Sequence, residues 1–391
     1  MEHALHQYEI YFTGLGGQTP RFPITYAGLE QAAREVLDDR AFGYVAGGAS
    51  SEDTVRANTE AFRRHRIVPR MMVDVAARDC RTEVLGTPLP APLLLAPIGV
   101  QSIIHEEAEV ATARGAAAAG VPFVLSTAAS RTLEDVAEAA GDLRRWYQLY
   151  WPDDRDLAAS FVQRAEAAGY EAIVVTLDTK LLAWRPRDLE TAYLPFLHGE
   201  GIANYLADPA FRARLEQAPE SSTEAMQAAI LTWAAVFSDK RVTWDDLAWL
   251  REQTSLPIVL KGVLHPEDAR IAVDRGVDGL VVSNHGGRQV DHEVAALDAL
   301  PEVVAAAGPE VPVLLDSGVR TGVDVFVARC LGARAVLVGR PWCYGLALGG
   351  AEGVTHVLKS ILAEFDLTMA LTGQTSVDEL GPHLLRTRPT A

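Results

Sequence analysis

Cysteine is scarce in this sequence, and its scarcity limits both the fold and the redox environment. The 391 residues include only three cysteines, Cys80, Cys330 and Cys343. They are too few and too widely spaced for a disulfide framework or a zinc ribbon. We therefore expect reduced, mostly buried thiols, no bound metal and a cytoplasmic protein.

Basic residues and long apolar runs are also in short supply. Lys and Arg total 35 against 52 Asp and Glu, a formal charge of −17, and no dense basic tract is present. Nucleic acid is therefore not an expected partner. No stretch reaches the roughly 18 apolar residues of a membrane-spanning helix. The N-terminus "MEHALHQYEIYF" lacks the basic patch and apolar block of a signal peptide, so we expect neither membrane insertion nor export.

Hydrophobic residues are plentiful, at 49% of the chain, with 7% aromatic. This composition is too apolar for disorder and is enough for a large core. Length alone would allow two or three domains, but barrels of alternating strands and helices often use 250 residues or more as one unit.

One phrase recurs four times along the chain. A helical run ends at a glycine, and a short strand follows three residues later: "GVPFVLST" from Gly120, "GYEAIVVT" from Gly169, "GVDGLVVS" from Gly276 and "GARAVLVG" from Gly332. Glycine after a helix can adopt the left-handed conformation that closes the last turn, and an aliphatic run is typical of a strand buried on both faces. Each phrase predicts a helix that leads into a parallel strand.

Further strands and helix starts extend this pattern. Asp153 and Pro266 are expected to open helices. Eight strands are predicted, over residues 93–98, 122–127, 145–150, 172–177, 257–262, 279–284, 312–317 and 335–339. Eight parallel strands that alternate with helices indicate an α/β fold, a closed (β/α)8 TIM barrel. The competing architecture is a doubly wound open sheet, but "PIGVQS" rather than a glycine-rich dinucleotide turn follows the first strand.

The expected barrel unit spans residues 71–385. An N-terminal helical extension, 1–70, precedes it, with a helix at 26–39 and a glycine turn at Gly47 and Gly48, and residues 386–391 form a tail. About eighty residues separate the fourth strand from the fifth. Since connections that long are usually functional or mobile, we interpret residues 190–245 as a lid over the barrel mouth.

Polar residues and glycines mark all eight predicted strand ends. They are Pro97 and Gly99; Ser126 and Thr127; Gln148 and Tyr150; Thr176 and Asp178; Lys261; Ser283, Asn284 and His285; Asp316 and Gly318; and Gly339 and Arg340. Any one of them could be a helix cap or a solvated surface group. In a barrel they converge on one opening, where active sites form, and buried ionisable groups are costly unless paired. The joint pattern therefore predicts a site.

The last two strand ends predict a phosphorylated ligand. In such barrels phosphate often binds to the loops after strands 7 and 8, where backbone N–H groups point outward. Here those loops read "DSGVRTG" and "VGRP", with Arg320 and Arg340.

Five motifs, "SNHGGRQVD", "DSGVRTGVDVF", "VGRP", "QLY" and "TLDT", together resemble those of the FMN-dependent 2-hydroxy-acid oxidases and dehydrogenases, a family that includes glycolate oxidase and lactate monooxygenase. The likeness runs from about Tyr44 to "LTMALTGQTS". The segments "YFTGLGGQTPRFP" and "WRPRDL" are most similar to the lactate monooxygenase branch.

The resemblance implies catalytic roles at the strand ends. His285 would take a proton from the substrate, and Asp178 would orient and stabilise its imidazolium, as an imidazole base near neutral pH requires. Arg288 would clamp the substrate carboxylate in a bidentate manner. Arg185, Tyr44 and Tyr150 would assist in binding the carboxylate or hydroxyl. Lys261, beside the flavin pyrimidine, would favour the anionic reduced ring.

The resemblance also implies an FMN site. The isoalloxazine would rest on Pro97, Ile98 and Gly99. Polar groups would contact the ring edge, the ribityl chain and the phosphate, namely Ser126, Gln148, Thr176, Ser283, Asp316, Ser317, Gly318, Arg320, Gly339 and Arg340. Two positions depart from many relatives. Ala128 replaces a bulky aromatic, and Gly99 replaces an alanine and would leave extra room beside the flavin.

The expected function is oxidation of a lactate-like L-2-hydroxy acid to the 2-oxo acid by an FMN enzyme. Oxygen is the expected acceptor, with decarboxylation of a trapped product as the monooxygenase outcome. A hydroxy-acid oxidase that releases peroxide and a dehydrogenase with another acceptor are the alternatives. A flavin-free lyase with a Lys261 Schiff base and a non-catalytic binding protein are rivals from other classes. A homo-oligomer, tetramer or octamer, is expected.

Overall fold

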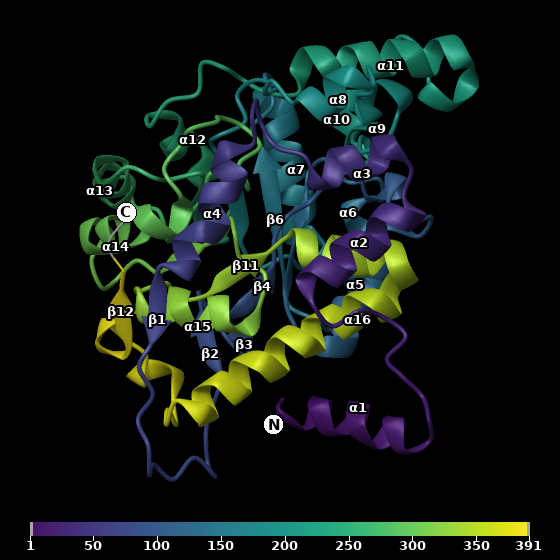
Figure 1. The fold of residues 1–391 in the computed structure, drawn as a ribbon. Helices are drawn as coiled ribbons and strands as arrows, with labels where there is room; N and C mark the ends of the chain where they lie inside the picture. The colour runs from purple at the N-terminus through teal and green to yellow at the C-terminus, as the bar shows by residue number, and fades with distance from the viewer. Residues whose placement is uncertain (1–2, 389–391) are drawn as a thin grey trace.

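A closed barrel of eight parallel strands forms the centre of the molecule. The computed structural model describes residues 3–388 (Figure 1). The strands follow the cyclic order β10-β11-β4-β5-β6-β7-β8-β9. They are β4 (Leu93–Leu95), β5 (Phe123–Ser126), β6 (Arg145–Tyr150), β7 (Ile173–Thr176), β8 (Ile258–Lys261), β9 (Gly279–Val282), β10 (Val313–Leu315) and β11 (Val336–Val338). All eight predicted strands are confirmed, and so is the TIM barrel.

Alternation along the strands explains how both faces of the barrel wall are buried. Successive side chains of a strand point to opposite faces. Leu94 packs inside the barrel with Val124, Trp146 and other residues of alternate positions, whereas Leu93 and Leu95 pack outward against the helices. Both faces of each strand are therefore buried, which accounts for the continuous aliphatic runs of the sequence.

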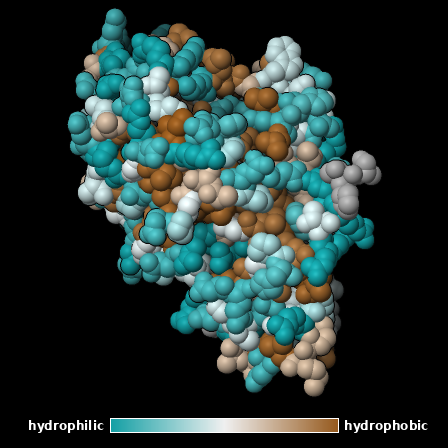
Figure 2. All heavy atoms as spheres, turned by 90° about the vertical axis from the view of Figure 1, so that its left-hand side faces the viewer, coloured by the Kyte–Doolittle hydropathy of each residue, from teal (hydrophilic) through white to brown (hydrophobic). Residues whose placement is uncertain are grey.

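Helices surround the barrel on all sides. They are α5 (Ala108–Ala119), α6 (Leu133–Ala140), α7 (Arg155–Ala167), α12 (Asp246–Gln253), α13 (Pro266–Asp274), α14 (Ala296–Ala307), α15 (Gly322–Cys330) and α16 (Arg340–Leu371), the last of which is kinked at Gly349 and Gly350. The helix predicted at Pro266 is confirmed. The helix predicted from Asp153 begins at Arg155 and is capped by Asp154, whose carboxylate accepts N–H bonds from residues 156 and 157. Hydrophilic residues cover much of the face shown in Figure 2, with apolar residues scattered among them.

The four glycines of the repeated phrase have the left-handed backbone that the sequence predicts. Their φ angles are 69° at Gly120, 75° at Gly169, 73° at Gly276 and 106° at Gly332. Each follows the end of a barrel helix, so each helix is turned back toward the next strand.

The N-terminal extension wraps around the barrel. Its helices are α1 (Leu5–Leu15), α2 (Tyr26–Val36), α3 (Asp39–Ala46) and α4 (Asp53–Arg63). Helices α1 and α2 pack on α16, α4 packs on α14, and α3 packs on α8 (Pro186–Glu190). The predicted helix at 26–39 ends at Val36, because Asp38 caps α3 by accepting a hydrogen bond from the Ala41 N–H.

The long connection between β7 and β8 carries several short helices. Besides α8 and α12 they are η2 (Pro195–His198), α9 (Ala203–Ala207), α10 (Pro209–Arg212), η3 (Pro219–Ser221) and α11 (Thr223–Val236). Helices α8 to α11 gather at the top of Figure 1. Helix α12 packs against α7 and takes the place of a regular barrel helix.

Two small sheets lie outside the barrel. The hairpin of β2 (Thr82–Val84) and β3 (Thr87–Leu89) packs Val84 and Leu89 against the interior cluster. Strand β1 (His65–Ile67) pairs with β12 (Leu385–Thr387). Strand β12 therefore runs across the boundary that we expected between the barrel unit, ending at residue 385, and the tail. The expected tail, 386–391, lies partly outside the described residues. Within residues 3–388 no helix is long and apolar enough to cross a membrane.

Candidate active site

One cleft opens among the carboxyl ends of the barrel strands. It measures about 1060 Å³, including the part open to solvent, and pockets that hold small molecules commonly measure about 300–1,000 Å³. Fifteen of the predicted site residues line it: Tyr44, Pro97, Ile98, Gly99, Tyr150, Arg185, Lys261, His285, Arg288, Asp316, Ser317, Gly318, Arg320, Gly339 and Arg340. The convergence that the sequence predicted is therefore observed.

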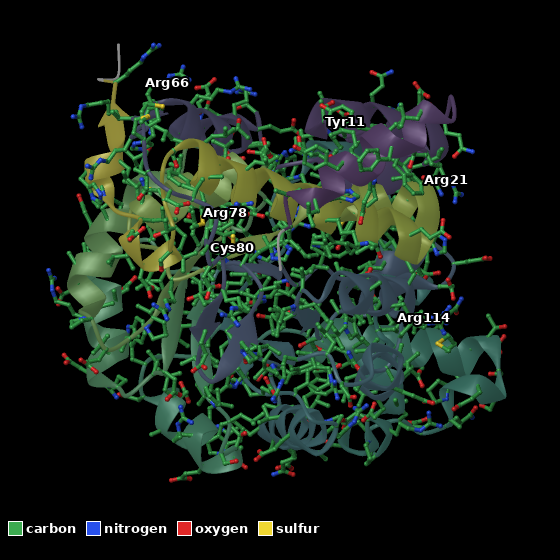
Figure 3. The ribbon with its side chains drawn as sticks, turned by 90° about the horizontal axis from the view of Figure 1, so that it is seen from below. Tyr11, Arg21, Arg66, Arg78, Cys80 and Arg114 are labelled. Atoms are coloured by element: carbon green, nitrogen blue, oxygen red, sulfur yellow. The ribbon has the colours of Figure 1, made fainter. Side chains whose placement is uncertain are left out.

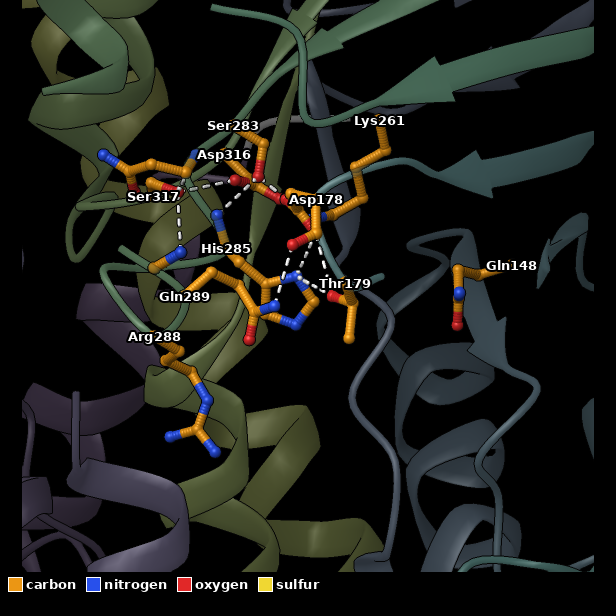
Figure 4. A network of polar contacts seen from close by, with 12 residues as sticks. Gln148, Asp178, Thr179, Lys261, Ser283, His285, Arg288, Gln289, Asp316 and Ser317 are labelled. Carbon is orange, nitrogen blue, oxygen red and sulfur yellow. Dashed lines mark hydrogen bonds and ion pairs between the residues drawn. The ribbon is translucent and has the colours of Figure 1, made fainter. Parts of the chain in front are cut away.

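His285 stands at the end of β9 in a strained backbone conformation. Its φ is 56°, in the left-handed region that non-glycine residues seldom adopt. The Ser283 hydroxyl accepts the His285 N–H at 3.0 Å, and the Ser317 hydroxyl accepts the Gly286 N–H at 2.9 Å. These two hydroxyls hold the turn and fix the direction of the imidazole (Figure 4).

Asp178 is the partner of this imidazole. Its Oδ1 lies 2.8 Å from His285 Nδ1, and the Thr179 hydroxyl lies 3.3 Å from the same nitrogen (Figure 4). When Nδ1–H donates to the carboxylate, the lone pair of Nε2 is left available. Asp178 itself does not line the cleft. Asp178 therefore orients the imidazole through Nδ1, on the side of the ring away from the cleft.

The charges around this pair favour a neutral imidazole and an ionised carboxylate. Burial lowers the pKa of His285 below its usual 6.5, and the nearby Asp178 charge opposes that effect. Burial also pushes the pKa of Asp178 upward, but His285 and Lys261 outweigh it, and the pKa falls to about 2. At neutral pH the imidazole can therefore accept a proton.

Lys261 is a buried ammonium at the end of β8, with 3% of its surface exposed. Its Nζ donates to Ser283 Oγ at 2.9 Å and lies 3.2 Å from Asp316 Oδ2. Burial lowers the pKa of the amine, but the charges of Asp316 and Asp178 more than offset it, and the pKa is raised. Lys261 is therefore a fixed positive charge at the floor of the cleft.

Arg288 brings a second positive charge to the cleft. Its Nη1 donates to the Gly47 carbonyl at 2.8 Å, and its guanidinium lies 5.1 Å from the centre of the Tyr44 ring. Burial lowers the pKa of Arg288 to about 9, with the nearby Arg185 contributing. Arg185 donates to the Arg288 carbonyl and the Gln289 side chain. Both arginines donate to neutral acceptors, and the charge of Asp188 acts on both without a hydrogen bond to either among the described residues. Their guanidinium groups can therefore bind an anionic ligand.

The "GG" of the motif allows Arg288 to turn back over the cleft. Gly287 has a φ of 74°, and a Cβ there would lie 2.7 Å from the Val55 backbone nitrogen. A side chain at this position would push α4 away from the loop after β9.

Aromatic residues form one wall of the cleft. The Tyr150 ring lies 5.1 Å from the Phe237 ring, and Phe237 also packs with Phe196 at 6.1 Å. Phe196, Phe237, Leu182 and Thr179 line the cleft, and the sequence did not predict them. Thr179 follows Asp178 in the TLDT motif, so its place at a strand end was a usable signal. The other three come from the long connection, where no strand end or spacing rule marks a cleft residue. For Phe196 and Phe237, the aromatic side chain in a suspected lid is the only signal that the sequence offers.

Four predicted flavin contacts do not line the cleft. Ser126, Gln148, Thr176 and Ser283 are buried at the strand ends around it. Gln148 Oε1 accepts from the Ser126 hydroxyl at 2.9 Å, whereas Gln148 Nε2 is buried with no partner among the described residues. An unpaired buried donor is costly unless a ligand or water meets it.

The two arginines of the predicted phosphate site differ. Arg340 donates through Nε, Nη1 and Nη2 to the carbonyls of Val45, Gly286 and Gly47. Arg320 lies 4.6 Å above the centre of the Tyr26 ring, and its buried Nε has no partner among the described residues. Arg320 therefore has a donor left for a ligand, while Arg340 ties three loops together.

Gly99 does not provide the extra room that we expected. A Cβ at this position would lie 2.4 Å from the Ala128 carbonyl oxygen and 2.9 Å from the Ala128 Cβ. The direction in which a larger residue would project is already filled by the loop after β5. The glycine is thus required by close packing of the two loops, and the expectation of extra space was wrong.

Comparison with known proteins supports this picture. A family model described as FMN-dependent dehydrogenase matches residues 33–387. An L-lactate oxidase from Lysinibacillus sphaericus is 43% identical over 372 residues, 95% of each chain, and mouse 2-hydroxyacid oxidase 1 is 40% identical over 364 residues, 93% of this chain and 96% of the other. A crystal structure of mandelate oxidase with (S)-4-hydroxymandelic acid superposes with a TM-score of 0.82 at 39% identity, and covers 94% of this chain and 99% of that one. The chain therefore belongs to the FMN-dependent dehydrogenase family.

Proposed function

We propose that this FMN-dependent oxidoreductase oxidises a lactate-like L-2-hydroxy acid to the 2-oxo acid, with oxygen as the acceptor. The observation that supports it most directly is the meeting, in one cleft, of a neutral imidazole paired with a carboxylate and an arginine whose hydrogen bond goes to a backbone carbonyl rather than to a carboxylate. A base and an anion clamp are the two groups that a hydroxy acid requires.

The residues present fit FMN. The unpaired donors Gln148 Nε2 and Arg320 Nε suit the polar edge of the ring and the phosphate. Lys261, at the cleft floor, suits the pyrimidine end of the ring, while Asp316, Ser317, Gly318 and Gly339 line the part of the cleft assigned to the ribityl phosphate. When bound, FMN supplies the acceptor for the two electrons that leave the substrate.

The other side chains of the cleft would bind the substrate and move its proton. Arg288 would hold the substrate carboxylate with a bidentate pair of hydrogen bonds, assisted by Arg185, Tyr44 and Tyr150. His285 Nε2 would take the proton that the substrate releases, and Asp178 would stabilise the imidazolium so formed. The neutral phenol of Tyr150, whose pKa burial raises, can donate a hydrogen bond to the substrate.

The two oxygen-dependent outcomes differ in product. An oxidase converts lactate and O₂ into pyruvate and H₂O₂. A monooxygenase of the lactate 2-monooxygenase type converts lactate and O₂ into acetate, CO₂ and water, because the retained keto acid is decarboxylated before it leaves. Leu182, Phe196 and Phe237 of the long connection line the cleft. We favour the monooxygenase outcome because residues 190–245, as the proposed lid, would retain the product.

The lyase alternative is not favoured. A Schiff base requires a neutral amine, whereas Lys261 is held as an ammonium by Asp316 and Ser283. A lyase of that kind would also be colourless as purified, whereas the proposed enzyme is yellow.

The test is anaerobic mixing of the purified yellow protein with L-lactate. Bleaching of the flavin bands is expected, and a protein that stays oxidised with every 2-hydroxy acid offered would overturn the proposal. Stoichiometry of O₂, CO₂ and H₂O₂ in air then separates monooxygenase from oxidase. Fast reduction with negligible O₂ uptake would identify a dehydrogenase with another acceptor.

Two further properties remain part of the proposal. A cytoplasmic location is supported by the three cysteines, which are all free and buried as predicted. A homo-oligomer is supported by the exposed apolar side chains of α1, among them Tyr11, Phe12 and Leu15. Light scattering of the purified protein would measure its state.

A further inference from the structure

A carboxylate outside the cleft joins the two loops on which one side of the cleft is built. Glu109, on α5, has 1% of its surface exposed. Its Oε1 accepts the N–H of Gln101 at 3.2 Å and of Ser130 at 3.0 Å, and its Oε2 accepts the N–H of Arg131 at 3.1 Å. Gln101 belongs to the loop after β4, and Ser130 and Arg131 belong to the loop after β5.

Both of these loops present residues to the cleft. Pro97, Ile98 and Gly99 come from the first loop and Ala128 from the second. The loops touch at the Val100 N–H, which donates to the Ala128 carbonyl at 2.8 Å, and at Gly99, where no Cβ fits against Ala128. Their spacing therefore allows little adjustment.

The first loop is held in a conformation that it would not adopt alone. Val100 has a φ of 59°, a left-handed conformation that is strained for a β-branched residue. The next N–H, that of Gln101, is bound by Glu109, and the Gln101 side chain donates to the Ile98 carbonyl at 2.9 Å while it accepts from Thr112 on the same helix. Glu109 and Thr112 thus hold the strained turn from one face of α5.

Burial of the Glu109 side chain opposes its ionisation. It raises the pKa of Glu109 to about 7, and the backbone N–H groups of Ser130, Gln101 and Arg131, together with that of Glu109 itself, oppose the rise. A glutamine of the same shape could accept from Gln101 and Ser130 through its carbonyl. Its NH₂ group would then face the Arg131 N–H, and the third bond would be lost.

From this geometry we propose that Glu109 is a positioning residue of the active site. It sets the distance between residues 97–99 of the first loop, called the shelf below, and Ala128 of the second loop. Glu109 does not line the cleft. It acts through the two loops, and fixes the face on which the flavin ring rests and the width beside it. The proposal builds on the proposed function, because that function assigns the shelf to the flavin.

The experiment compares Glu109→Gln and Glu109→Ala with a matched control, Asp366→Asn. Asp366 is also a buried carboxylate that accepts a backbone N–H, from Ala4 at 2.8 Å, and it pairs with Arg78. Arg78 and Cys80 lie beside α16 on the side of the molecule seen from below in Figure 3. Neither they nor Asp366 line the cleft. Each FMN-loaded variant is measured for flavin absorption spectrum, two-electron midpoint potential, KM, kcat and melting temperature.

A shifted flavin spectrum and midpoint potential are expected for Glu109→Ala, with a fall in kcat of roughly tenfold to a hundredfold, the range for a misplacement of about 1 Å. Glu109→Gln keeps two of three contacts, so it should change the same quantities in the same direction by less. Asp366→Asn should lower only the melting temperature. If Glu109→Ala does not fold, the glutamine variant decides alone.

A loss of melting temperature in the Glu109 variants, with spectrum, potential and kcat as in the wild type, would overturn the positioning role. Failure of the proposed function would look different. It would appear in the wild-type protein itself, as a lack of flavin bands or of bleaching by any 2-hydroxy acid.

Discussion

The two ends of the barrel differ in the partners of their buried arginine and indole donors. At the end closed by the β2–β3 hairpin, Trp146 donates from its indole N–H to the Thr87 hydroxyl at 2.9 Å, and Asp366 pairs with Arg78 nearby. At the cleft end, Arg288 and Arg185 find only neutral acceptors, and Arg320 Nε finds none. At the closed end Arg78 has a carboxylate partner, whereas within residues 3–388 the guanidinium groups of Arg288 and Arg185 make no hydrogen bond to a carboxylate. Buried atoms without a partner among the described residues occur at both ends, because Thr82 Oγ1 in β2 and Arg145 Nε at the start of β6 also lack one. The difference in charge pairing, rather than unmet donors alone, marks where an anionic ligand completes the structure.

The largest expected effect that would sharpen this contrast comes from His285→Ala. The variant should still bind FMN, because the imidazole has no partner among the donors assigned to the flavin, but it should lose about 10²–10⁴-fold in the rate of flavin reduction. Stopped-flow absorbance under anaerobic conditions measures that rate. Near-normal reduction would remove the assignment of the base.

Arg288→Lys should have the next largest effect. A point charge cannot reproduce the fork of the guanidinium, so KM for the hydroxy acid should rise by roughly 10- to 100-fold, as expected for the loss of a hydrogen bond to a charged group. Steady-state kinetics measure KM, and the flavin spectrum of the resting enzyme serves as the control. An unchanged KM would mean that the cleft does not hold the acid through this residue.

The pH dependence of kcat/KM should report the protonation of the His285 imidazole. Only the neutral form accepts a proton, and burial lowers its pKa below 6.5, so activity should be full above that pKa and fall as the pH drops through it. The Asp178 charge raises the pKa of His285, so Asp178→Asn should move this acid limb to lower pH while it slows the reaction. If the acid limb of the pH profile lies at the same pH in Asp178→Asn as in the wild type, the Asp178 charge does not set the pKa of His285.

The smallest effect on activity should come from the closed end. Asp366→Asn leaves Arg78 with a weaker partner and should lower the free energy of unfolding by about 1–3 kcal/mol, with kcat and KM unchanged. Chemical denaturation measures the first quantity. A large change in kcat or KM for Asp366→Asn would show that the closed end also contributes to activity.

Local signals explain why the sequence was sufficient for the barrel. The glycines after four helices, the aliphatic runs and the polar strand ends are each set by neighbouring residues, and the fold places all eight strand ends together whatever the loops do. The residues that escaped prediction depend on distant contacts. Phe196 and Phe237 reach the cleft only because the long connection folds back, and Gly99 is constrained by Ala128, nearly thirty residues later.

The hydrogen bonds of Arg340 have a consequence for how the protein could be divided. This one guanidinium binds carbonyls of Val45 and Gly47 in the N-terminal extension and of Gly286, which follows His285. The extension therefore forms part of the cleft, and a barrel expressed without it would lose one side of the cleft. Attempts to minimise, permute or transplant this scaffold should keep residues 39–63 attached and make their cuts elsewhere.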